Sequence, residues 1–360
     1  MANTALDGSA VALSDSLRER ELAVRPLADA APAWDAFVAR AEESSFCHLA
    51  AWREILSEVL GAECLYWAAT DHNGDWQGVL PLARVKSRIF GHYLVSLPFL
   101  NYGGPLGTPA ARRRLAQAAV EEARRSHADL LELRTRQETG LDLTVSARKI
   151  TVLLDLPRSS QALWDAFPPK LRSQIRRPIK AGLEVKFGAA QREAFYEVFA
   201  RGMRDLGTPV LPRAWFERIA MHFPRHVTFG VAYCRGQPLA AGCGFVWEKE
   251  FEMTWACALR AESRLAANML LYWSFLEEMI GRGVRVFNFG RCTPGGGTHR
   301  FKQQWGGRDL PLLWCQYASR GRAATPSPHD AAFSWAPRVW RRLPLPIANL
   351  LGPRLVRFLP

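Results

Sequence analysis

The order of predicted helices and strands occurs twice along this chain, and this doubling limits the possible folds most strongly. Residues 34–46 and 49–61 show helical spacing of apolar side chains, residues 64–87 read as a hairpin, and residues 108–128 form a helix. From Leu163 the same alternation begins again, with helices over 162–182, 192–207 and 212–224. A strand meander over 227–259 and a buried helix over 266–283 follow. The pattern predicts two related α/β domains that meet near residues 155–165.

Local signals support the individual elements. Asn73-Gly74 is a typical hairpin turn, and Thr108 with Pro109 provides an N-cap and first helical residue. Residues 162–182 read as a helix interrupted by prolines. We predict a disordered N-terminus over 1–22, a first domain over 23–160, a second over 161–320 with the active cleft, and a basic tail over 321–360.

The charge balance favours anionic partners. Lys and Arg number 47 against 34 Asp and Glu, which gives +13. Residues 168–186 hold six basic residues and one acidic residue, and residues 321–360 hold six arginines and one aspartate. Either stretch could instead be an ordinary solvated face. The tail also mixes tryptophan, leucine and proline, so it could lie in an anionic membrane interface or pack back on the second domain.

Several classes are excluded or disfavoured by their missing signatures. The seven cysteines form no CxxC pair, so neither a disulfide framework nor a zinc ribbon is expected. No secretory signal and no run of about 18 apolar residues is present, so we expect a cytoplasmic protein, at most peripheral to the inner membrane. The chain lacks the P-loop, GxSxG and HExxH patterns, and Pro224 between His222 and His226 disfavours a metal pair there.

The segment 287–307, FNFGRCTPGGGTHRFKQQWGG, carries the most specific chemistry. We expect Thr298 to cap a short helix that Gly306 ends in the left-handed conformation. Phe301 and Trp305, four residues apart, then pack inward as a pair. Lys302 shares another side of this helix with His299, at a strand-end cleft where its charge could stabilise a developing oxyanion.

At these residues the chain resembles the FemAB-related N-acyltransferases, especially the branch associated with exosortase (PEP-CTERM) and exopolysaccharide systems. Five further stretches agree with that family in order and spacing, so the resemblance covers roughly residues 25–360. They are residues 95–107, 171–188, 203–219, 268–291 and 340–357. The resemblance implies an α/β (α+β) fold with two tandem GCN5-related N-acyltransferase (GNAT) domains, each a mixed, mostly antiparallel sheet flanked by helices.

The resemblance also implies site residues. Phe301-Lys302 stands at the place of a Phe-Lys pair whose lysine stabilises the tetrahedral intermediate, and Arg172 matches an arginine that contacts precursor phosphates, with Arg176 one turn further. The full set of expected substrate-binding residues is Arg172, Arg176, Phe301, Arg291, Asn101, Tyr102 and Trp305. Lys302 and His299 are the expected catalytic residues, with His299 either a general base or a spectator that lines the ligand site.

Some positions depart from the family. Asn288 replaces the usual aspartate of the Phe-Asp-Phe-Gly-Arg strand, and Leu106 follows Pro105 where Fem enzymes place an acid nearby. Residues 259–270 lack the glycine-rich turn that binds the pyrophosphate of acyl-CoA. We therefore expect no tightly bound cofactor and no metal, and leave the donor open between aminoacyl-tRNA and acyl-CoA.

The predicted function is transfer of an acyl or aminoacyl group to an amine of a cell-envelope precursor, peptidoglycan-like or exopolysaccharide, either free or lipid-linked. One alternative is an acyl-CoA-dependent enzyme of polysaccharide biosynthesis. Another is a non-catalytic scaffold of that machinery, which the missing acids favour. A nucleic-acid-binding module is disfavoured because the basic stretches lack interleaved aromatic residues. The oligomeric state stays open.

Overall fold

The computed structural model describes residues 22–27, 30–87, 90–136, 140–319 and 335–359. Residues 1–21 and 320–334, which hold most of the predicted disordered N-terminus and the start of the predicted tail, lie outside these ranges. Contacts divide the chain into two compact units. Unit 1 contains Met1–Ala147, Leu312–Thr325 and Phe358–Pro360, and unit 2 contains Arg148–Pro311 and Pro326–Arg357. The domain ranges given above stay a prediction.

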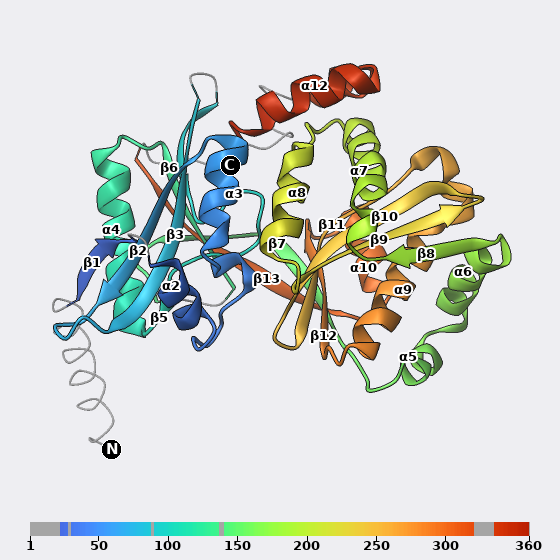
Figure 1. Cartoon of the computed structure of the whole chain (residues 1–360), viewed down its shortest axis with the longest axis horizontal. Coiled ribbons are helices and arrows are strands. Elements are labelled where there is room, and N and C mark those ends of the chain that lie inside the picture. The colour runs from blue at the N-terminus through green and yellow to red at the C-terminus, as the bar shows by residue number, and fades with distance from the viewer. Residues whose placement is uncertain (1–21, 28–29, 88–89, 137–139, 320–334, 360) are drawn as a thin grey trace. The chain divides into compact units, whose positions relative to one another are not determined.

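Unit 1 is a mixed sheet covered by helices (Figure 1). Its strand order is β1-β2-β3-β4-β6-β13, with β5 beside β3, and only β4 and β6 are parallel. The strands are β1 (Ala23–Pro26), β2 (Glu63–Thr70), β3 (Trp76–Ser87), β4 (Gly91–Val95), β5 (Leu106–Gly107), β6 (Leu130–Thr135) and β13 (Arg308–Ala318), whose last residues belong to this unit. The helices are α2 (Ala31–Val38), α3 (Ala51–Leu60) and α4 (Pro109–Arg125).

Helix α4 covers the core of unit 1 and confirms its predicted start. The Thr108 side chain accepts a hydrogen bond from the Ala111 N–H, and Pro109 is the first helical residue. Ala111, Leu115 and Ala119 of α4 pack in one cluster with leucines of β3, β4 and β6. The small alanines let the helix approach the sheet closely, because each adds little height to the helix surface.

A buried ion pair stabilises the loop that follows β4. Arg134 donates to the Glu132 carboxylate at 2.9 Å and to the carbonyls of Leu97 and Leu100 at 3.1 and 2.9 Å. Leu97 has a positive φ of 62°, a conformation that costs free energy for a branched side chain. The guanidinium therefore satisfies carbonyls that this irregular loop removes from regular pairing.

Unit 2 has the strand order β7-β12-β11-β10-β9-β8, with β11 and β12 the parallel pair. Its strands are β7 (Thr144–Asp155, from Arg148 onward), β8 (Leu183–Phe187), β9 (Val227–Cys234), β10 (Gln237–Trp247), β11 (Glu250–Ala258) and β12 (Val286–Cys292). Its helices are α5 (Ser160–Ala166), α6 (Pro169–Lys180), α7 (Arg192–Leu206), α8 (Arg213–His222), α9 (Ala267–Gly281), α10 (Gly297–Gln303), α11 (Ala336–Trp340) and α12 (Leu345–Val356).

Helices cover both faces of the unit 2 sheet. The Phe229 ring of β9 packs on Phe195 of α7, with ring centroids 5.4 Å apart. A side chain at the next residue, Gly230, would meet Phe275 of α9. Successive residues of a strand point to opposite faces, so α7 and α9 lie on opposite sides of the sheet. The predicted proline-interrupted helix over 162–182 is two helices, α5 and α6, separated at Phe167-Pro168.

Among the helices of the described residues, none combines the length and apolar character needed to cross a bilayer.

In each unit, helices flank a mostly antiparallel sheet, and this architecture agrees with the predicted fold class.

Candidate active site

The centre of unit 2 is the place where β11 and β12 separate. Their parallel pairing covers only Glu250–Glu252 with Val286–Asn288. Beyond that point β12 also loses register with β7, between Asn288 and Arg291. Gly290 has a φ of 72°, and a Cβ there would lie 2.4 Å from the Met253 carbonyl oxygen, so only glycine fits. At Gly290 and Arg291 this irregular backbone presents its carbonyl groups to a side-chain donor.

Lys302 satisfies those carbonyls. From α10 its Nζ donates to the Gly290 carbonyl at 2.7 Å and to the Arg291 carbonyl at 3.0 Å. Lys302 is only 4% exposed, so its ammonium is buried and does not lie at the mouth of a cleft as the sequence analysis expected. Burial lowers the pKa of Lys302 to about 8, while Cys292 and Glu252 act to raise it and Arg291 to lower it. At neutral pH the ammonium form therefore predominates, with one N–H beyond the two that the carbonyls accept.

Two acidic residues that the sequence analysis did not identify lie beside this centre on β11. Glu252 is 2% exposed and stands opposite Asn288 in the parallel register. Glu250 accepts a hydrogen bond from Asn288 Nδ2 at 2.8 Å. The residue pattern of β11 does not single out these two glutamates, because their contacts depend on the pairing of β11 with β12.

Asn288 connects three strands through its amide. Its Oδ1 accepts from the Gly290 N–H at 2.9 Å and from the Thr151 hydroxyl, and its Nδ2 donates to Glu250. An aspartate here would lose the donor and bring a second carboxylate to Glu250. The departure from the family pattern thus fits its surroundings, because a side chain that both donates and accepts is required.

His299 joins the glycine-rich loop to β13. Its Nδ1 accepts from the Gly295 N–H at 2.9 Å, and its Nε2 donates to the Asp309 carboxylate at 2.9 Å. Both ring nitrogens are therefore engaged, and the sequence analysis missed Asp309. The expected cap at Thr298 is wrong, because α10 begins earlier and Gly296 is its N-cap. Gly306 adopts the expected left-handed conformation, with φ of 86°.

Aromatic contacts connect α10 with the basic helix α6. The Phe301 and Trp305 rings form the predicted pair, with centroids 6.2 Å apart. Further rings continue from Trp305 to Phe167 at 5.7 Å, from Phe167 to Trp273 at 5.8 Å and from Trp273 to Trp164 at 5.0 Å. The Arg176 guanidinium lies over the Trp164 ring at 5.1 Å.

The other arginines expected in the site are also in unit 2. Arg172 is half-buried on α6, and its Nε is a buried donor with no hydrogen-bond acceptor. Arg291 is half-buried at the end of β12, where its carbonyl accepts from Lys302. The structure therefore gathers Lys302, Arg291, His299, Phe301 and Trp305 around α10. It also links Arg176 to them through the aromatic rings.

Asn101 and Tyr102 lie in unit 1 and are both buried. Tyr102 lines a small cavity together with Ser45, His48, Gly104 and Arg134. Burial lowers the pKa of His48 to about 4, so its imidazole is neutral at physiological pH. The Arg136 guanidinium lies over the Tyr102 ring at 4.8 Å.

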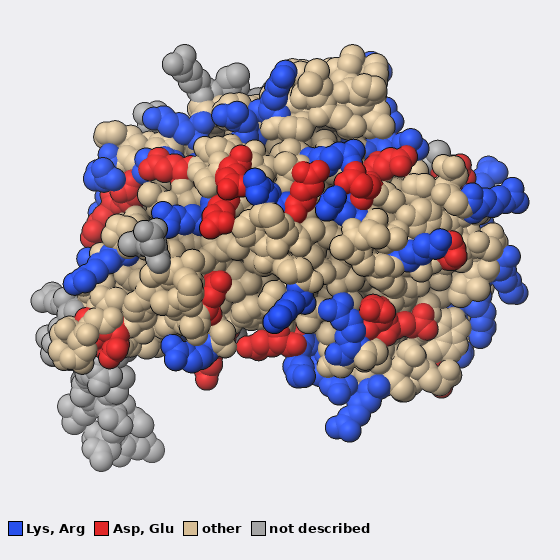
Figure 2. Space-filling model, in the orientation of Figure 1, with Lys and Arg blue, Asp and Glu red and all other residues tan. Residues whose placement is uncertain are grey.

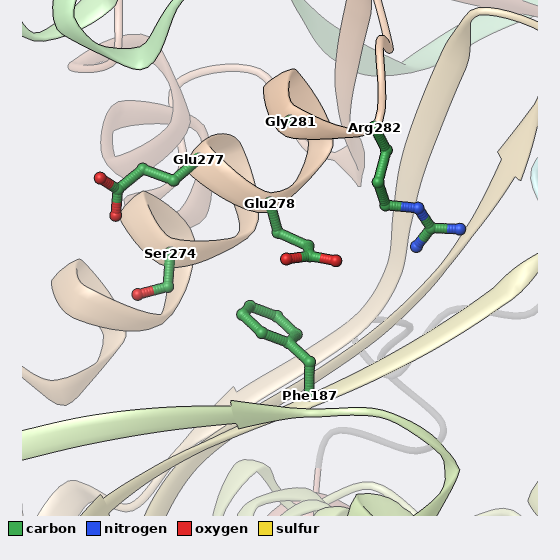
Figure 3. Close-up of a pocket in the computed structure, with 6 residues that line it drawn as sticks. All are labelled: Phe187, Ser274, Glu277, Glu278, Gly281 and Arg282. Atoms are coloured by element: carbon green, nitrogen blue, oxygen red, sulfur yellow. The ribbon is translucent and has the colours of Figure 1, made fainter.

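A second, more open pocket lies on α9 of unit 2 and contains none of the predicted site residues. Phe187, Ser274, Glu277, Glu278, Gly281 and Arg282 line it (Figure 3). Arg282 donates to the Thr228 hydroxyl at 2.7 Å, and burial raises the pKa of Glu277. Within the described ranges, no group of His, Cys, Asp and Glu side chains has the arrangement needed to hold a metal ion.

Comparisons with known proteins show which families and folds this chain is similar to. Residues 169–303 match the family described as an acetyltransferase (GNAT) domain. No curated protein sequence matches significantly. The structure of FemX superposes with a TM-score of 0.61 at 13% identity, over 82% of this chain and 97% of FemX.

Two further solved structures are similar. A tandem GNAT protein from the clavulanic acid biosynthesis pathway has a TM-score of 0.53 at 14% identity, over 84% of this chain and 100% of that one. The C-terminal domain of a putative lysylphosphatidylglycerol synthetase from Agrobacterium fabrum has a TM-score of 0.52 at 14% identity, over 73% and 86%. The predicted class of tandem GNAT folds is confirmed, and residues 169–303 match a GNAT acetyltransferase domain.

The geometry of His299 predicts that it holds the glycine-rich loop. His299→Ala removes the acceptor of the Gly295 N–H, so hydrogen exchange of that amide should become roughly tenfold faster. Asp309→Asn keeps an oxygen that can accept from Nε2 and should leave the amide close to its original rate. Exchange measured residue by residue by NMR decides this, and an unchanged Gly295 amide in His299→Ala contradicts the assignment.

Proposed function

We propose that Lys302 is the oxyanion-stabilising residue of an N-acyl or aminoacyl transfer onto an amine of a cell-envelope precursor. The observation that carries the proposal is its buried ammonium, held by two carbonyls at the point where β11 and β12 separate. Two of the three hydrogens are committed to backbone, which orients the third. Such a donor is already in position when charge develops, and it costs no reorganisation.

The reaction follows from that placement. The lone pair of a neutral amine attacks the donor carbonyl carbon, the C–O π bond opens, and the resulting oxyanion accepts from Lys302. Collapse of this intermediate expels the thiolate of an acyl thioester or the ribose oxygen of an ester, and the nitrogen loses its proton. A base at His299 would have to release Gly295 or Asp309 first. We therefore assign His299 to positioning, with the amine deprotonated by water before attack.

Acyl-CoA is the donor that the GNAT match supports best. Helix α9 follows Ala266, which has a left-handed φ of 52°, and no side chain caps its first turn. The Met269 N–H of this turn already donates to the Ala266 carbonyl at 2.9 Å. The two N–H groups before it are the ones that we assign to a diphosphate, in place of the glycine-rich turn.

A specific observation favours aminoacyl-tRNA as the second candidate. Helix α6 contains Lys170, Arg172, Arg176, Arg177 and Lys180 and no acidic residue. A polyanion on this helix would release counterions, so its binding would weaken steeply with salt. The same helix could instead hold the diphosphate of a precursor, through Arg172 and Arg176.

The acceptor we propose is an amine of a peptidoglycan-like or exopolysaccharide precursor, free or lipid-linked. The sequence resemblance supports it, with Phe301, Trp305, Arg291, Asn101 and Tyr102 as further substrate contacts. The exosortase-associated branch stays a prediction.

Donor and acceptor can be identified together. Purified protein is incubated with acetyl-CoA or with charged tRNA, each with an amino-sugar or a peptidoglycan precursor, and products are read by mass spectrometry. A product from acyl-CoA supports the first donor, and a product from charged tRNA supports the second. A chain that binds precursor and yields no product with either donor contradicts the enzyme and favours the scaffold alternative.

Removing the lysine should abolish most catalysis. Lys302→Met keeps the buried volume and loses the oxyanion donor, so kcat should fall by about 10²-fold or more. Lys249→Met, at an exposed lysine of the β10–β11 turn, is the matched control and should retain full activity. Circular dichroism verifies that both variants are folded. Retention of kcat within about threefold in folded Lys302→Met rejects the role.

The decrease of kcat at alkaline pH should follow the deprotonation of Lys302. The lysine is charged below its pKa of about 8, so kcat should be level there and fall as pH rises through that value. The Glu252 carboxylate raises this pKa, so Glu252→Gln should move the limb to lower pH. Glu248→Gln, at an exposed turn, should leave it in place. A limb unmoved in Glu252→Gln contradicts the coupling.

A further inference from the structure

The C-terminal helices of unit 2 present an apolar outer face. Helix α12 turns Ala348, Gly352 and Val356 inward, where they are buried at intervals of four residues. Residues on the other side of the helix, and on α11 before it, are exposed. The α11–α12 face consists of Trp335 59%, Val339 51%, Ile347 44%, Leu350 58%, Leu351 37% and Leu355 36% exposed.

The inner side of these helices is held in a defined orientation on α7. Arg204 of α7 donates to the Leu343 carbonyl at 3.2 Å, and Arg341 donates to the Leu206 carbonyl at 3.2 Å. A Cβ at Gly352 would lie 2.9 Å from the Val210 nitrogen, so glycine lets α12 approach closely. The exposed leucines are therefore directed outward by fixed contacts.

Basic residues accompany the apolar side chains. Residues 335–357 contain Arg338, Arg341, Arg342, Arg354 and Arg357 and no aspartate or glutamate. In Figure 2 the surface over α12, at the top of the view, is tan with blue side chains at its margins. A protein partner would have to complement both an apolar ridge and the positive charges beside it, whereas an anionic bilayer provides an apolar interior and negative headgroups at once.

We propose that the α11–α12 face docks on the surface of a lipid bilayer that contains anionic lipids. Helix α12 has 12 residues, about 18 Å of length against a hydrocarbon core of about 30 Å, so it lies in the interface and does not cross it. Leucines enter the boundary of the acyl chains, Trp335 sits at headgroup level, and the arginines bind lipid phosphates. The inference does not rest on the proposed transferase reaction.

Vesicle co-sedimentation of the full chain tests the docking. Wild-type protein should bind phosphatidylcholine vesicles that carry roughly one phosphatidylglycerol in three lipids, bind pure phosphatidylcholine weakly, and lose affinity as salt rises. The double variant Ile347→Asp, Leu350→Asp should bind at least roughly tenfold more weakly. Arg354→Glu should lose roughly tenfold on the anionic vesicles and little on the neutral ones.

Matched substitutions elsewhere separate docking from overall charge. Val145→Asp and Arg40→Glu change an exposed apolar and an exposed basic residue of unit 1, and both should bind vesicles as wild type does. Equal binding by the α11–α12 variants and these controls overturns the proposal. So does wild-type protein that binds no vesicle, or that is a dimer which the Ile347, Leu350 variant converts to monomer, since a second copy then covers the face.

Discussion

The two hydrogen bonds from Lys302 to the carbonyls of Gly290 and Arg291 are the interaction on which the rest of unit 2 depends. The parallel pairing of β11 with β12 ends at Glu252 and Asn288, and the register of β12 with β7 shifts between Asn288 and Arg291. Buried carbonyls without donors would cost about 1–3 kcal/mol each. A neutral amide NH2 group could satisfy both of them with no hydrogen left over, whereas an ammonium can satisfy two and still offer a hydrogen to a ligand. The residue that makes the irregular strand stable is thus also the strongest candidate for the chemistry.

The buried ammonium of Lys302 explains why a buried carboxylate, Glu252, lies on the neighbouring strand. Burial lowers the pKa of Lys302 to about 8, and Cys292 and Glu252 oppose that shift, so the ammonium persists at neutral pH. Asn288, opposite Glu252, ties β7, β12 and the Gly290 backbone together without adding a carboxylate. Of these two facing residues, Glu252 acts on the charge of Lys302, whereas Asn288 holds the backbone through hydrogen bonds.

Much of the fold could be predicted because it is local. Local patterns located most of the helices before the tail, the Thr108 cap and the inward pair of Phe301 and Trp305, whereas α11 and α12 were not predicted. The parts that failed or were missed depend on partners distant in sequence. Glu252 and Asp309 become important only through strand register and through the fold-back of α10. Thr298 failed as a cap because Gly296 already adopts the extended conformation that starts the helix. Lys302 was identified as functional, but its burial required knowledge of the carbonyls that it satisfies.

The net charge of +13 illustrates how one number can conceal several different roles. Arg134 and Lys302 are buried, and their charges are used on backbone carbonyls inside their own units. The arginines of α6 and of the α11–α12 face are mostly exposed, and no acidic residue occurs in either segment. Exposed groups such as these can attract a polyanion or a membrane, whereas a charge that is already hydrogen-bonded inside the protein contributes little field at the surface. The sequence predicts that the binding partner is negatively charged, whereas burial determines which basic residues can contact it.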